Sequence, residues 1–149
     1  MKRRAFLTAL AGGGVAVTAG GLFLVFRERT AQASKLFSPE EASWLTVLIP
    51  VDVALAAIEP KLDEERVEFY RAALLHLRRL RPGFPGEPAL EQARFVKGLL
   101  ESDEFVLQFL TQLAHDASEV YYATDRGRAA VGYAGPPQPR GFPGYQGRP

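Results

Sequence analysis

The chain has 149 residues, of which 47% are hydrophobic and 23% charged, and this length suits a single domain with a modest core. The formal net charge is +1 and no basic stripe suits a nucleic-acid backbone, so we expect no nucleic-acid partner. The lack of cysteine excludes disulfides, thiolate nucleophiles, cysteine-bound zinc, iron–sulfur clusters and covalent haem attachment. Two histidines are too few for a convincing metal site.

The front of the chain, MKRRAFL, predicts a twin-arginine export signal. In that signal an arginine pair precedes an x-Phe-Leu, and the apolar run that follows is only moderately hydrophobic, as is the glycine-containing run over residues 5–26. The signature residues are Arg3, Arg4, Phe6 and Leu7. An ordinary secretory signal, with two adjacent arginines by chance, is the alternative at this point.

The end of this first segment, residues 1–33, leaves cleavage and retention open. Ala31 and Ala33 form an A-x-A match for signal peptidase, with the cut before Ser34. A run of about 20 apolar residues is also long enough to anchor the chain in the inner membrane. In either case we expect the body of the protein in the periplasm or on the outer face of the cytoplasmic membrane.

Residues 34–131 predict a helical domain, because apolar residues recur there at spacings of three and four and no stretch alternates convincingly with a period of two. Ser38 and Glu41 can form a capping box at the first helix start. The fold class is therefore all-α, a small helical bundle. We expect helices from Pro39 to about Ile49, over about 63–80, over about 89–100, and from a Ser102-Asp103 cap to about Tyr121, with a Pro/Gly loop over 82–88.

The last segment, residues 132–149, predicts an extended tail. Ten of its eighteen residues are glycine or proline, and the aromatic residues Tyr133, Phe142 and Tyr145 are spaced along it. A flexible terminus is one interpretation. The other is a strap whose aromatic side chains dock in pockets on a partner, with the prolines reducing the entropy lost on binding.

No catalytic, cofactor-binding or metal-ligating residue is expected in this chain. His115 and Asp116 are adjacent, but neighbouring helical side chains diverge by about 100°, so adjacency does not make them a hydrogen-bonded dyad. We expect Asp116 to cap or pair locally and His76 to be a partly solvated helix residue. The acidic residues that gather near helix starts are explained by the helix dipole.

Three stretches carry a resemblance to a known family. They are the twin-arginine front, the run from Phe37 to Asp52 with its S-P-E-E start and I-P-V-D end, and GYAGPPQPRGFPGY after a Tyr-Tyr pair. The chain resembles the gluconate 2-dehydrogenase subunit 3 family, the small accessory subunit of membrane-associated FAD-dependent sugar and sugar-acid dehydrogenases. The closing run is the most specific of the three stretches.

The resemblance implies a non-catalytic subunit that binds and stabilises a flavoprotein large subunit and supplies its twin-arginine export signal. FAD would belong to that large subunit, and electrons would pass to a haem-bearing cytochrome c subunit or another acceptor. The residues expected to bind the partner are Tyr121, Tyr122, Gly132, Tyr133, Gly135, Pro136, Pro137, Pro139, Gly141, Phe142 and Tyr145.

Two other functions stay open at this point. One is a stand-alone, envelope-anchored helical scaffold or interaction module without any redox connection. The other is a small enzyme that uses His115 or a carboxylate.

Overall fold

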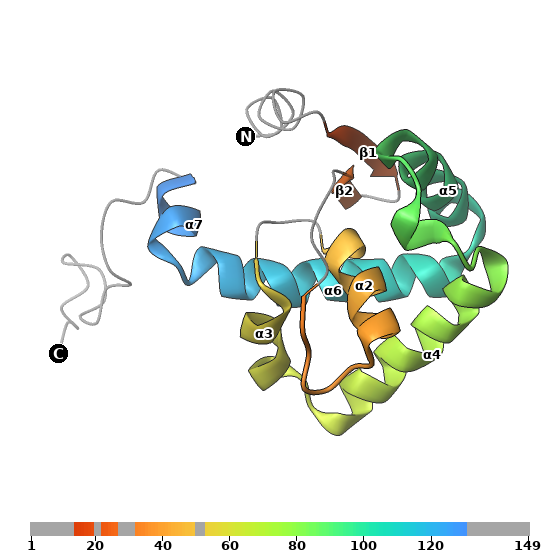
Figure 1. Cartoon of the computed structure of the whole chain (residues 1–149). Coiled ribbons are helices and arrows are strands. Elements are labelled where there is room, and N and C mark those ends of the chain that lie inside the picture. Colours follow the sequence, from red (N-terminus) through yellow and green to blue (C-terminus); the bar gives the residue numbers. More distant parts are fainter. Residues whose placement is uncertain (1–13, 20–21, 27–31, 50–52, 131–149) are drawn as a thin grey trace, which may run out of the picture.

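The computed structural model describes residues 14–19, 22–26, 32–49 and 53–130, and most of the described chain is helical (Figure 1). This confirms a mainly α fold, to which the structure adds a two-stranded hairpin that was not predicted. The elements are β1 (Val15–Ala19), β2 (Leu22–Phe26), α2 (Pro39–Leu48), α3 (Leu55–Ile58), the 3₁₀ turn η1 (Glu59–Lys61), α4 (Glu64–Leu80), the 3₁₀ turn η2 (Phe84–Gly86), α5 (Ala89–Ser102), α6 (Glu104–Tyr122) and α7 (Asp125–Ala130).

Helix α2 begins as its sequence predicts. The Ser38 backbone N–H donates to Glu41 Oε2 at 2.8 Å, and the Glu41 N–H donates to Ser38 Oγ at 3.2 Å. These two bonds are the capping box, with Pro39 in the first turn. The prediction of this helix start is therefore confirmed.

Helices α4 and α6 both begin at an aspartate. Asp63 accepts a hydrogen bond from the Arg66 N–H at 2.8 Å, and Asp103 accepts one from the Val106 N–H at 3.1 Å. Asp103 also ends α5, since its own N–H donates to the Leu99 carbonyl at 2.7 Å. Helix α5 thus runs through Ser102, slightly further than expected, and one residue joins it to α6.

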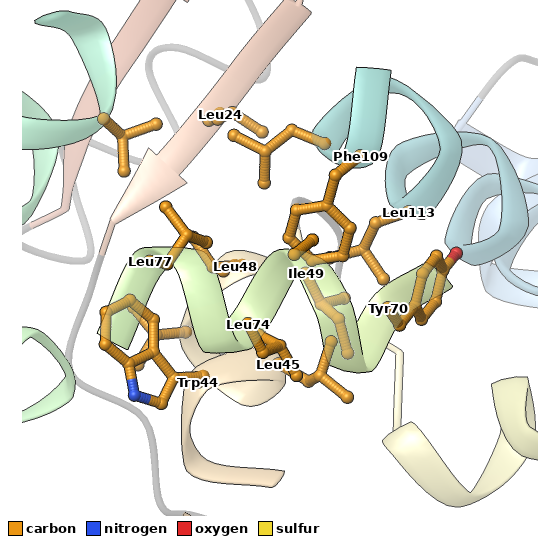
Figure 2. Close-up of a cluster of buried hydrophobic side chains, with 14 of the residues drawn as sticks. Leu24, Trp44, Leu45, Leu48, Ile49, Tyr70, Leu74, Leu77, Phe109 and Leu113 are labelled. Carbon is orange, nitrogen blue, oxygen red and sulfur yellow. The ribbon is translucent and has the colours of Figure 1, made fainter. Parts of the chain in front are cut away.

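The core lies where α2, α4 and α6 meet, and Figure 2 shows the side chains that fill it. Each large apolar side chain that is fully buried there stabilises the fold by about 1.5–3 kcal/mol. The labelled core residues with exposures of 2% or less are Leu24, Trp44, Leu45, Leu48, Ile49, Tyr70, Leu74, Leu77, Phe109 and Leu113.

The unpredicted hairpin, β1 and β2, lies against α5 (Figure 1). Its strands are antiparallel, with Val17 opposite Leu24. Val17, Leu24 and Phe26 are buried, and the Phe26 ring meets the Phe84 ring edge-on at 6.4 Å between centroids. β2 is apolar throughout and Thr18 is the one polar residue of β1, so the strands show little alternation and periodicity does not reveal them.

The hairpin belongs to the apolar run that the sequence assigns to an export signal or membrane anchor. Within the described residues, none of the helices combines the length and the apolar character that a bilayer crossing requires.

Candidate functional site

A buried carboxylate, Asp116 on α6, is the centre of a polar cluster inside the helical body. Its side chain accepts hydrogen bonds from Arg66 Nη1 at 2.8 and 2.9 Å and from Gln112 Nε2 at 3.1 Å. The Tyr70 hydroxyl also donates to it. We call these four residues the Asp116 cluster, and it links α4 to α6.

The charge states in this cluster are fixed by its contacts. Burial lowers the pKa of Arg66, but its hydrogen bond to Asp116 and the charge of that carboxylate outweigh burial and leave the pKa raised. Burial, followed by the hydrogen bond to Asp116, raises the pKa of Tyr70 far above its ordinary value. Tyr70 therefore stays a neutral donor and Arg66 stays a cation, which suits a structural clamp between helices.

A cleft of about 350 Å³ lies beside the Asp116 cluster. Among its polar groups, Arg66 and Gln112 donate to Asp116, and Asp63 caps α4. Three of the polar groups of the cleft are therefore already engaged in contacts that hold the fold together. Its lining residues are Asp63, Glu65, Arg66, Phe69, Gln108 and Gln112.

His115 does not join Asp116 in a dyad. Its side chain is 63% exposed, with Nδ1 3.8 Å from Asp116 Oδ1 and Nε2 3.9 Å from Glu119 Oε1. Both distances exceed hydrogen-bonding length. Asp116 was expected to pair locally, and that expectation is wrong in part: it bonds Gln112 one turn away, but also Arg66 and Tyr70 on another helix.

The other histidine, His76, has a role that the sequence did not reveal. His76 Nε2 lies 2.7 Å from Asp103 Oδ2, and the Phe105 ring stands edge-on to the imidazole at 5.9 Å. The hydrogen bond to His76 is the largest influence on Asp103, and it lowers the pKa of that carboxyl group although burial opposes it. His76 thus ties α4 to the start of α6.

A second buried carboxylate, Glu59 in η1, holds the chain that follows the hairpin. It is 7% exposed and accepts hydrogen bonds from the Ser34 hydroxyl and from the Lys35 N–H at 3.2 Å. Two residues before Ser34, Gln32 Oε1 accepts a hydrogen bond from the Leu55 N–H at 2.6 Å. Residues on either side of the expected cleavage position are therefore bound to the helical body.

Of the residues predicted to bind a partner, the structure describes Tyr121 and Tyr122. They lie at the C-terminal end of α6 with ring centroids 5.2 Å apart, and Tyr122 is 41% exposed. Helix α7 returns closely against this end, because a Cβ added to Gly127 would lie 2.0 Å from the Tyr121 carbonyl oxygen. Glycine is thus required at this contact.

The remaining predicted site residues lie outside the described part of the chain. They are Arg3, Arg4, Phe6, Leu7 and Ala31 of the export signal and the motif residues from Gly132 to Tyr145. Ala33 is described and exposed. Among the described residues, no group of three His, Cys, Asp or Glu side chains is placed to hold a metal ion.

Comparison with protein-family models, with curated proteins and with solved structures gives no match for this chain.

Proposed function

We propose that this chain is the non-catalytic small subunit of an exported FAD-dependent sugar or sugar-acid dehydrogenase. The observation that carries the proposal is the closing motif GYAGPPQPRGFPGY, which resembles the end of the gluconate 2-dehydrogenase subunit 3 family. The subunit binds and stabilises the flavoprotein, which carries FAD, and the complex passes electrons to a cytochrome c subunit or another acceptor. It works in the periplasm or on the outer face of the inner membrane.

The described part of the protein offers support for a binding role. A mainly helical body held by internal clamps presents an exposed tyrosine, Tyr122, at the end of α6, eight residues before the described chain ends. Amphipathic aromatic side chains at such positions are favoured anchors in protein interfaces. The motif begins at Gly132, after α7, and we propose that the tyrosine pair and the tail bind the same partner.

Isolation of the full chain from its native envelope tests this proposal. An antibody against the helical body is expected to isolate a complex that shows the absorption bands of FAD and oxidises a sugar or sugar acid. Isolation of the chain without flavin and without dehydrogenase activity would support the stand-alone scaffold instead.

The export role has its own test, the double variant Arg3→Lys with Arg4→Lys. Because the twin-arginine route accepts folded cargo through that pair, we expect both this chain and active flavoprotein to remain in the cytoplasm, measured by fractionation. The matched control is Arg27→Lys with Arg29→Lys, which keeps the charge after the apolar run and should leave export unchanged. Active flavoprotein in the periplasm of the double variant would contradict the escort role.

A further inference from the structure

The hairpin of β1 and β2, called here the leader hairpin, uses residues that the proposed function assigns to the export leader. Residues 15–26 are the second half of the apolar run over residues 5–26. In the structure residues 15–19 and 22–26 of this run pack on one side of the helical body. The same segment would thus serve both as part of the folded body and as the apolar part of the export leader, and it cannot do both at once.

The leader hairpin is docked by apolar burial. Val17, Leu24 and Phe26 are 5%, 2% and 1% exposed, respectively. Figure 2 shows Leu24 among the same core side chains as Phe109 of α6. The Phe26 ring meets Phe84, which in turn stacks on the Trp44 indole at 4.7 Å. The hairpin is therefore packed into the core itself.

The docked state also holds the chain on the far side of the hairpin. Five residues separate Phe26 from Gln32, which bonds the backbone of α3. Ser34 and Lys35 then bond the buried Glu59. The chain is therefore bound to the body both before and after residues 27–31.

Export needs the apolar run in a different state. A leader is read by its receptor as an accessible segment, and a bilayer accepts an apolar segment as a helix, since the unpaired edges of a two-stranded hairpin are not tolerated in lipid. The two strands, residues 15–19 and 22–26, cannot be packed against α5 and available to a receptor or a bilayer at the same time. The fraction of undocked molecules then sets the apparent affinity of the leader for its receptor.

We propose that the docked leader hairpin is an autoinhibitory contact that withholds the apolar part of the export leader until it detaches from α5 and η2. This inference rests on the proposed export function. It adds that the folded body of the subunit, and not the arginine pair alone, sets how readily the leader is used.

The test weakens docking from the body side, so that the leader sequence stays unchanged. In the full chain, Phe84→Leu removes the ring that meets Phe26. Hydrogen exchange should show the paired amides of residues 15–19 and 22–26 protected in the unaltered chain and exchanging at least tenfold faster in the variant. Transport of the full chain into inverted membrane vesicles that carry the twin-arginine translocase should accelerate in parallel. Val67→Ala, a core substitution on α4, is the control. It should change neither the exchange rate of the hairpin amides nor the rate of transport.

A second manipulation keeps the two strands of the hairpin paired with each other. It does not fix the hairpin on α5, so it tests whether the strands must separate before the leader can be used. Ala16 and Val25 are direct cross-strand partners, and the chain has no cysteine of its own, so Ala16→Cys with Val25→Cys can form one defined disulfide. The oxidised full chain should be transported at least tenfold more slowly than the same chain after reduction. Each single cysteine variant serves as a control that oxidation alone is harmless.

The outcomes separate this inference from the proposed function. Unprotected amides over residues 15–26 in the unaltered chain, or a Phe84→Leu chain whose hairpin opens without faster transport, would overturn autoinhibition while leaving the export role intact. A transport rate that is unchanged in the Arg3→Lys, Arg4→Lys double variant would overturn both the autoinhibition and the export role. If Phe84→Leu also removes protection from α4 and α6, Val96→Ala on α5 replaces it as the milder variant.

Discussion

Asp116 shows at residue scale how a charge is accommodated inside a small helical body. Its carboxylate is 7% exposed, and it is tolerated because Arg66, Tyr70 and Gln112 all donate to it. Tyr70 has no exposed surface, so its hydroxyl depends on this one acceptor for a hydrogen bond. Removing one member of the cluster would therefore leave another buried polar group of the α4–α6 contact without its hydrogen-bond partner.

Removing the acceptor should expose this dependence. Asp116→Ala is expected to lower the free energy of unfolding by about 1–3 kcal/mol in urea titrations, because the buried Tyr70 hydroxyl loses its partner. Arg66 is 32% exposed, so water can solvate part of its charge and limit the loss. Asp125→Ala, which breaks the exposed pair with Arg128, is the control and should have no measurable effect.

A double variant checks the cause. Tyr70→Phe removes the hydroxyl, so no buried donor is left without an acceptor when Asp116 is removed. Asp116→Ala should therefore lower the free energy of unfolding less in the Tyr70→Phe background than in the unaltered chain. Strictly additive losses would show that the hydroxyl is not the reason. This contact could not be predicted from the sequence, because Arg66 and Asp116 are 50 residues apart and their pairing depends on how α4 and α6 pack.

At the scale of elements, the sequence correctly predicts those helix starts that are fixed by hydrogen bonds between residues close together in the chain. The starts of α2, α4 and α6 follow from Ser38, Asp63 and Asp103, each of which accepts a hydrogen bond from a backbone N–H three residues later. The leader hairpin has no such local sign. Its strands are almost wholly apolar, with Thr18 the one polar residue, and they are defined by pairing and by packing on α5, which depend on the rest of the fold.

The start of α6 should depend on pH through Asp103. A carboxyl group with a lowered pKa stabilises the fold above its ordinary pKa, near 4, and that stabilisation disappears as the pH falls through the lowered value. His76→Ala should therefore raise the pKa of Asp103 toward its ordinary value in an NMR titration. The stability lost by the variant should be largest above about pH 4 and should vanish in stronger acid.

His115→Ala is the matched control for that titration. His115 is 63% exposed and lies near Asp116 and Glu119. Its removal should leave the Asp103 titration unchanged. An Asp103 pKa that stays low in the His76 variant would show that the hydrogen bonds from the α6 backbone, and not the imidazole, lower it.

At the scale of the whole molecule, the two segments with expected functions join the helical body at separate places. The leader hairpin lies against α5, whereas α7 lies at the opposite end of α6 (Figure 1). The proposed binding of a partner through the tail would therefore be a separate event from docking of the leader hairpin. The sequence predicts the order of these segments along the chain, but the separation in space of the leader hairpin and α7 follows from the length of α6.

Deletion of residues 132–149 should separate binding from folding. We expect at least a tenfold weaker affinity for the flavoprotein, because aromatic anchors dominate such interfaces, and an unchanged helical signal per molecule in circular dichroism. Replacing Tyr133, Phe142 and Tyr145 by serine in the full-length tail should reproduce the loss. An undiminished complex in both variants would contradict the proposed strap.

The single residue between α5 and α6 has a consequence for how sequences of this kind can change length. Asp103 is the C-cap of α5 and also the N-cap of α6, so no other residue lies between the two helices. One inserted residue would turn α6 by about 100° and carry Phe109 and Leu113 away from the core. Natural insertions should therefore be rare at this joint, which makes Asp103 a fixed reference point for aligning relatives.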